Sequence, residues 1–208
     1  MARLPFRDRN EAGRRLAAEL PSLDRPIVLG LPRGGVPVAA AVARAIGAPL
    51  DVFVVRKLGV PVQPELAMGA VASGGVRVVN DDVIRQSRVS ADVLEEVTAR
   101  ERAVVESRER FYRGDRPPPA LDGRDVVLVD DGLATGATMR AAVAAVREHA
   151  PSRVVVAVPV APAETVAAFA RDGIEIVCVR APATFVAVGA WYRDFRQIED
   201  DEVVRYLS

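Results

Sequence analysis

The hydrophobic positions of the chain form short runs that alternate with segments of helical periodicity. The runs are rich in Val, Ile and Leu and predict buried strands over 26–31, 51–56, 124–130, 152–161 and 174–180. Between them, helices are predicted over 36–47, 136–150 and 163–173, with Gly47 and Gly173 as stop signals. Continuous apolar strands that alternate with helices indicate an α/β fold, in which both faces of a parallel sheet are covered.

The alternation is interrupted between residues 58 and 123, which we interpret as an insertion into the core. Within it, 66–80 predicts a hairpin that turns at Ser73–Gly75. Residues 90–114 predict a long charged helix with Ser90 as its N-cap, for which we favour a solvated or oligomer-forming role. We expect one domain, with a core of about 25–57 and 124–180 and a small C-terminal segment of about 181–208 that joins the N-terminal segment.

Three polar motifs each follow a predicted core strand: PRGG at 32–35, Arg56-Lys57, and DDGLATGAT at 130–138. Ligands of parallel α/β sheets bind outside the carboxyl ends of the strands. We therefore expect the three motifs to converge on one site.

The motif at 130–138 contains two adjacent acidic residues, followed by a helix N-terminus that could bind an anion. Asp130 and Asp131 are adjacent like charges at the end of a buried strand, where desolvation strengthens their repulsion. The next residues open a helix whose first N–H groups are unpaired, which favours a phosphate there. The two carboxylates could then accept hydrogen bonds from the vicinal hydroxyls of a ribose whose 5-phosphate lies in the turn. The alternative is an ordinary Asp-Gly turn with an incidental second aspartate.

The stretch VVLVDDGLATGAT closely resembles the phosphoribosyl pyrophosphate (PRPP) signature of type I phosphoribosyltransferases. The resemblance implies a Rossmann-like parallel core, with the hairpin and long helix inserted as a lid region and residues 181–208 as a hood. It also implies that Asp130 and Asp131 are catalytic and hold the ribose. The implied PRPP-binding residues are Asp130, Asp131, Gly132, Ala134, Thr135, Gly136, Ala137 and Thr138.

By the same resemblance, PRGG corresponds to the pyrophosphate loop, with Arg33, Gly34 and Gly35 at the anion and Arg33 in a catalytic role. Arg56 and Lys57 are expected to face the same pyrophosphate, Lys57 as a catalytic cation. Lys57 is the single lysine among 28 basic residues. The alternatives are that Arg33 is an ordinary solvated arginine and that a lysine arose at position 57 by chance. Glu65 is a candidate to position this cluster of basic residues.

The resemblance places an acceptor-binding hood after the last predicted core strand. Phe185, Val186 and Trp191 are the candidates for contact with an acceptor base, although a small aromatic core is an equal alternative for Trp191. Asp194 is a candidate ligand for Mg²⁺, which otherwise would be held through PRPP and water.

The implied activity is transfer of the 5-phosphoribosyl group from PRPP to a nitrogenous acceptor, expected to be a nucleobase, with release of pyrophosphate and with Mg²⁺ as cofactor. A PRPP-binding regulator without turnover is the main alternative. A metal-dependent phosphatase is another, but it would need further metal ligands that the sequence does not show.

Composition restricts the expected binding partners and the expected cellular location. Acidic and basic residues balance at 28 each, which makes a general nucleic-acid or membrane binder unexpected. One cysteine excludes an intramolecular disulfide framework and fits a reducing compartment. With no apparent signal peptide or long apolar segment, we expect a cytoplasmic protein, and the charged helix suggests a homodimer.

Overall fold

The computed structural model of the chain describes residues 5–208, apart from the side chains of Pro64 and Glu65. Its core is a five-stranded sheet in the order β2-β1-β6-β7-β8, and every neighbouring pair is parallel. These strands are β1 (Ile27–Gly30), β2 (Leu50–Val52), β6 (Asp125–Val129), β7 (Arg153–Val160) and β8 (Glu175–Arg180). The parallel α/β core expected from the apolar runs is confirmed.

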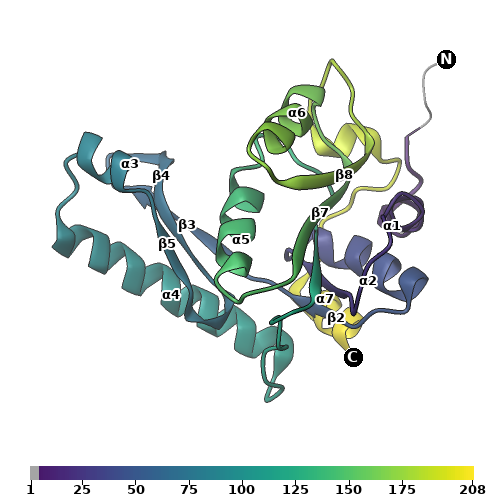
Figure 1. Cartoon of the computed structure of the whole chain (residues 1–208), viewed down its shortest axis with the longest axis horizontal. Helices are drawn as coiled ribbons and strands as arrows, with labels where there is room; N and C mark the ends of the chain where they lie inside the picture. The colour runs from purple at the N-terminus through teal and green to yellow at the C-terminus, as the bar shows by residue number, and fades with distance from the viewer. Residues whose placement is uncertain (1–4) are drawn as a thin grey trace.

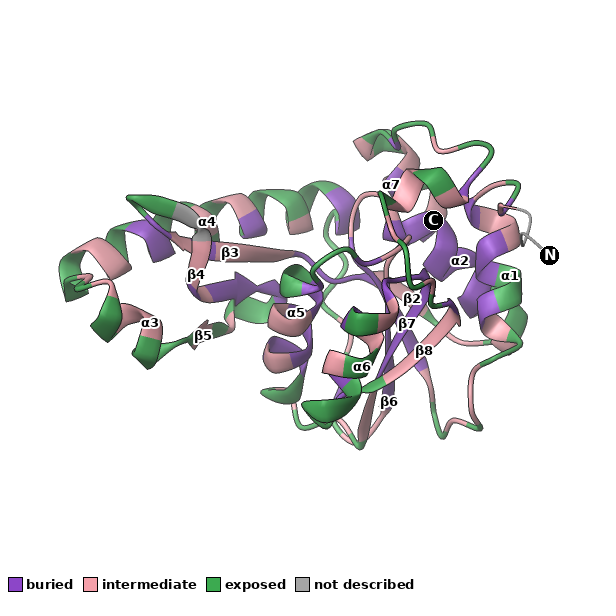
Figure 2. Cartoon of the chain, turned by 90° about the horizontal axis from the view of Figure 1, so that it is seen from above, coloured by how far each residue is buried: buried purple, intermediate pink, exposed green. Residues whose placement is uncertain are grey.

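Helices cover both faces of this sheet (Figures 1 and 2). Helices α5 (Ala137–Arg147) and α6 (Ala163–Arg171) pack on the face that contains Leu29 and Leu128. Helices α1 (Arg9–Ala17) and α2 (Gly35–Ile46) pack on the other face, against Val28 and Val127 and their neighbours. Side chains of successive strand residues thus enter opposite cores, which explains why the strand sequences are apolar throughout.

The predicted strand over 51–56 is wrong, because the chain changes sheets inside it. β2 ends at Val52, and Phe53 N still donates to Gly30 O of β1. Val54 N instead donates to Ser73 Oγ, and Ser73 N donates back to Val54 O. Arg56 and Lys57 therefore belong to the next strand, β3 (Val55–Val60), which lies outside the core sheet.

The inserted segment forms an arm that projects from the core (Figure 1). Strand β3 pairs with β4 (Gln63–Ala72), and β4 pairs with β5 (Arg77–Val79), both antiparallel. The expected turn between β4 and β5 is present as a short 3-10 helix, η1 (Ser73–Gly75). The hairpin between β3 and β4 and the helix α3 (Asp81–Gln86) were not predicted.

The long helix of the arm is α4 (Ala91–Arg113), capped as expected by Ser90, whose side chain accepts from Val93 N. One face of α4 is buried against the arm sheet through Val97 and Val105, so only the remainder is solvated. At its end, buried Arg113 donates from Nε to Asp51 Oδ1 over 3.0 Å and from Nη2 to Val52 O over 2.9 Å. These contacts fix the arm to the edge strand β2.

The C-terminal segment folds back over the beginning of the chain. It contains the 3-10 helix η2 (Val188–Trp191) and the helix α7 (Asp200–Leu207). Phe6 N donates to Trp191 O, Arg193 N donates to Phe6 O and Asp194 N donates to Arg7 O, over 2.7, 2.8 and 3.0 Å. The name hood is kept below for residues 181–199, because α7, at the end of the expected segment 181–208, packs against α4 and α2. Among the described residues, none of the helices combines the length and the apolar character needed to cross a bilayer.

Candidate functional site

Two carboxylates lie at the carboxyl end of β6, in a turn that is largely shielded from solvent. Asp131 N donates to Asp130 Oδ1 over 2.8 Å, so the backbone itself orients the first side chain. Burial raises the pKa of Asp130 well above its usual value, and the adjacent charge of Asp131 raises it further. The turn thus holds two acidic groups that resist simultaneous ionisation.

Helix α1 supplies a cation that the sequence analysis missed. Arg9 donates from Nε and Nη2 to Asp131 Oδ2 over 2.9 and 2.8 Å. Its Nη1 donates to Arg196 O over 2.9 Å, and its guanidinium carbon lies 4.0 Å from the ring centre of Phe195. The residue is only 7% exposed. Burial raises the pKa of Asp131, and the Arg9 charge opposes that rise.

One oxygen of each aspartate remains available. Asp130 Oδ1 accepts from Asp131 N and Asp131 Oδ2 accepts from Arg9. Asp130 Oδ2 and Asp131 Oδ1 accept no hydrogen bond from any residue in the described part of the chain. The turn therefore offers two neighbouring acceptors, which is the number that a vicinal diol requires.

The glycines of PRGG let their loop lie directly on this turn. A Cβ at Gly34 would overlap Asp131 Oδ2, and one at Gly35 would stand 2.8 Å from Asp130 Cα. The structure thus brings together two of the three predicted motifs. The peptide bond between Pro32 and Arg33 is cis.

Gly34→Ala tests this close approach. The added methyl group would displace the carboxylate that Arg9 holds, so we expect the affinity for PRPP that the sequence resemblance implies to fall about tenfold or more, a loss of about 1.4 kcal/mol. Isothermal titration calorimetry measures the loss. Gly47→Ala is the control, because it lies at the other end of α2 with nothing within 4 Å and a strained φ of 66°. Equal losses in both variants would contradict a specific contact.

The segment after the aspartates is open at the start of α5. Gly136 has a φ of 75°, and a Cβ there would stand 2.5 Å from Phe169 Cε2, so this position requires glycine. Ala134, Thr135, Ala137 and Thr138 are exposed, while Thr165 Oγ1 donates to Ala134 O and steadies the turn. The first N–H groups of α5 face an accessible surface, as an anion site requires.

Arg33 lies against the beginning of α7 in this structure. Its Nη1 is 3.6 Å from Glu199 Oε2 and 3.9 Å from Asp200 Oδ2, and about a third of its side chain is exposed. Ion pairs of this length and exposure contribute little stability. An anion at the PRGG loop could therefore compete for Arg33 at small cost.

The third motif faces a cavity of about 620 Å³ next to the first two. Arg56 and Lys57 line it from β3, Pro32 from the PRGG loop and Thr138 from α5. A further part of the lining belongs to α4, through Arg100, Glu101 and Arg108. The sequence analysis missed this contribution of α4. The side chain of Glu65, the candidate positioning residue, lies outside the described residues.

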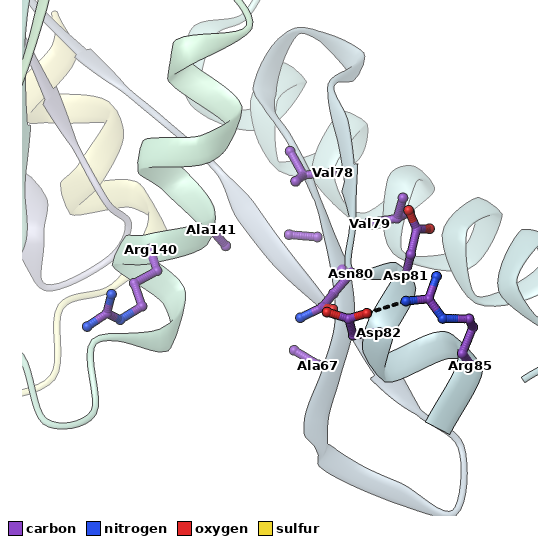
Figure 3. A pocket seen from close by; sticks show the side chains of 11 residues that line it. Ala67, Val78, Val79, Asn80, Asp81, Asp82, Arg85, Arg140 and Ala141 are labelled. Carbon is purple, nitrogen blue, oxygen red and sulfur yellow. Dashed lines mark hydrogen bonds and ion pairs between the residues drawn. The ribbon is translucent and has the colours of Figure 1, made fainter. Parts of the chain in front are cut away.

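Another cavity, of about 550 Å³, lies between α5 and the arm (Figure 3). Its walls include Asn80 and Asp82, and Asp82 pairs with Arg85 of α3. Arg140 points away from the arm, toward its partner Asp172. None of the predicted site residues lines this cavity.

The candidate acceptor residues are separated from the aspartate turn. Val186 is 87% exposed, and it shares a cavity of about 160 Å³ with Trp191 that contains no residue of the three motifs. Phe185 is half-buried. Two other hood residues lie at the turn instead: Tyr192, whose hydroxyl donates to Asp131 O over 2.5 Å, and Val188, which a Cβ at Gly132 would overlap, while Phe195 stacks on Arg9.

Asp194, the candidate metal ligand, is exposed and accepts from Arg196 N over 3.2 Å. Within residues 5–208, no three His, Cys, Asp or Glu residues are gathered as a metal site would need. Mg²⁺ is commonly held by one or two carboxylates together with substrate phosphates. The available oxygens of Asp130 and Asp131 fit that donor set better than Asp194 does.

The family model described as phosphoribosyl transferase domain matches residues 8–178. A Mycobacterium tuberculosis H37Rv relative, with the provisional name phosphoribosyl transferase Rv0571c, is 53% identical over 207 residues, 98% of this chain. The chain spans only 46% of that relative's length. The crystal structure of TT1426 from Thermus thermophilus is 48% identical, covers 98% of both chains and superimposes with a TM-score of 0.90.

Proposed function

The chain belongs to the phosphoribosyl transferase domain family, and we propose that it transfers the 5-phosphoribosyl group of PRPP to a nitrogenous acceptor, with release of pyrophosphate. The observation that carries this proposal is the pair of available oxygens, Asp130 Oδ2 and Asp131 Oδ1, beside the open start of α5. A ribose diol and its 5-phosphate match these two features. A nucleobase is the acceptor we favour.

In this proposal each motif has one task. The N–H groups and hydroxyls at 134–138 hold the 5-phosphate, and the aspartates hold the diol. Arg33, the amides of Gly34 and Gly35, and the Arg56-Lys57 pair stabilise the departing pyrophosphate. Bound Mg²⁺ would supply further positive charge for the leaving group, and Asp130 and Asp131 are the residues that would hold it. As carbon 1 of the ribose becomes cationic, the negative field of the aspartates favours that charge.

The arm and the hood also have roles in the proposed reaction. We propose that residues 1–208 act as one phosphoribosyltransferase domain, with the arm at 58–123 as lid and the hood over the diol site. A cytoplasmic location and a homodimer remain predictions. Regulation by PRPP without turnover is the competing proposal, and it is favoured by the acceptor candidates Val186 and Trp191, which line a cavity that contains no residue of the three motifs.

A screen for pyrophosphate release separates the two proposals. The protein is incubated with PRPP and Mg²⁺ against purines, pyrimidines and amines, and released pyrophosphate is measured. We expect release with at least one acceptor, and a decrease of roughly 10²–10³-fold in Lys57→Gln, because a positioned cation at the leaving group is lost. Arg102→Gln, at an exposed position of α4, is the control.

Calorimetry with PRPP completes this test. Binding of PRPP without release under any acceptor would support the regulator. Absence of PRPP binding in the presence of Mg²⁺ would overturn both proposals.

A further inference from the structure

The cavity beside the PRGG loop has two cationic walls. Strand β3 contributes Arg56 and Lys57, and helix α4 contributes Arg100 and Arg108. Among the described side chains that line the cavity, Glu101 is the single acid beside four basic residues, in a chain whose net charge is zero. The proposed reaction assigns a role to the basic residues of β3 only, so the basic residues of α4 have no assigned role.

The two arginines of α4 reach the cavity because of their helical spacing. Val97, Glu101 and Arg108 are separated by four and seven residues, which places them on one face of a helix, with Arg100 beside Glu101. Glu101 accepts from Arg56 Nε over 2.9 Å and from Arg100 Nε over 3.2 Å, so it joins the two walls. Arg108 makes no hydrogen bond or ion pair with any described residue.

Arg108 and Arg33 both lie near enough to the hydroxyl of Tyr112 for their charges to act on it. Burial and a hydrogen bond to Asp200 raise the pKa of Tyr112, and the positive charges of Arg108 and Arg33 both act on that hydroxyl in the opposite direction. Arg108 therefore belongs to the same region of positive charge as Arg33, although Arg33 itself does not line the cavity.

The size and charge of the cavity together indicate the class of ligand. Its volume of about 620 Å³ falls within the range of about 300–1,000 Å³ that small-molecule sites occupy, more than a pyrophosphate group fills. Guanidinium groups bind phosphate oxygens through paired, charge-assisted hydrogen bonds. A ligand that used both walls would need anionic groups at successive positions.

We propose that Arg100 and Arg108 form a second anion subsite, through which the cavity binds an oligophosphate of at least three phosphates, free or attached to a nucleoside, in competition with PRPP. The competition rests on the proposed function, whereas the binding of the oligophosphate does not. The β3 wall holds the first two phosphates, and the α4 wall holds those that follow.

Calorimetry with phosphate chains of different length tests this subsite. Inorganic pyrophosphate, inorganic tripolyphosphate and ATP are titrated at constant ionic strength into the full chain without PRPP. We expect tripolyphosphate to bind about tenfold or more tightly than pyrophosphate, since each added charge-assisted contact strengthens binding by roughly that factor. The Arg100→Gln, Arg108→Gln double variant should lose this advantage while its affinity for pyrophosphate changes less than about threefold.

The control is Arg102→Gln with Arg110→Gln, which removes the same charge from α4 at exposed positions outside this cavity. Equal loss in this control would show a general effect of net charge and would overturn the subsite. Equal weakening of pyrophosphate and tripolyphosphate by the Arg100 and Arg108 changes would also overturn it, because α4 would then belong to the pyrophosphate site.

Two further titrations distinguish a nucleotide from a free oligophosphate and test whether the oligophosphate competes with PRPP. Tighter binding of ATP than of tripolyphosphate would support a nucleotide ligand, and equal or weaker binding a free chain. Wild-type protein that binds tripolyphosphate but not PRPP would leave the subsite standing and overturn the proposed function. PRPP binding that is unaffected by saturating tripolyphosphate would overturn the competition.

Discussion

Asp130→Asn is expected to lose PRPP binding by at least about 10²-fold while the folded protein becomes no less stable. The substitution keeps the shape of the side chain and replaces a carboxylate oxygen that would accept from a ribose hydroxyl. A hydrogen bond to a charged group contributes about 1.5–3 kcal/mol, and the field at the ribose is lost in addition. Calorimetry with PRPP and Mg²⁺ measures the change.

The difference in stability between this variant and the wild type depends on pH in a defined direction. The raised pKa of Asp130 means that the folded protein holds this proton more tightly than the unfolded chain does. Stability is therefore lost as pH rises from the ordinary carboxyl range, about 3.9, through the raised pKa. Asparagine does not ionise, so Asp130→Asn should be more stable than wild type at pH 8, with less difference at pH 4. A variant that unfolds more easily at pH 8 would contradict the repulsion at this turn.

Arg9→Met should be the most destabilising single change at the site. It leaves the Asp131 carboxylate, 15% exposed, without its cation, and breaking a buried ion pair on one side costs about 3–5 kcal/mol. The loss also allows the pKa values of both aspartates to rise further, so binding of PRPP should weaken near neutral pH and partly recover at higher pH. Urea denaturation and calorimetry between pH 6 and 9 measure the two effects.

Two further variants serve as controls for Arg9→Met. Arg9→Lys restores the charge without the paired donors, and we expect intermediate stability together with a pH dependence close to that of wild type. Arg14→Met removes an exposed arginine from the same helix and should change neither property. Loss of stability in Arg9→Met with an unaltered pH dependence of binding would show that Arg9 acts only as a structural contact.

The sequence predicted the parts of the fold that depend on local signals. Four of the five core strands, the cap of α4 at Ser90 and the turn at Ser73–Gly75 depend on periodicity and turn residues within a few positions. The aspartate turn was recognisable for the same reason, since its repulsion and its glycines lie within one short stretch. The role of its residues in PRPP binding stays a prediction.

Features that depend on distant partners were not predictable in this way. Arg9 is 122 residues from Asp131, and nothing in its own helix distinguishes it from Arg14. The only available signal was the requirement that two buried like charges need a cation. The change of sheets after Val52 likewise depends on Ser73, which replaces β1 as the partner of the continuing strand.

The two ends of the chain are joined at the hood. Residues 6 and 7 exchange backbone hydrogen bonds with 191–194, and Arg9 and Tyr192 hold Asp131 from the two ends of the sequence. Opening the hood would therefore have to release or carry along the first turn of α1. A fusion partner attached ahead of Phe6 would thus be coupled to the entrance of the diol site, whereas one attached after Ser208 would follow α7 and the arm.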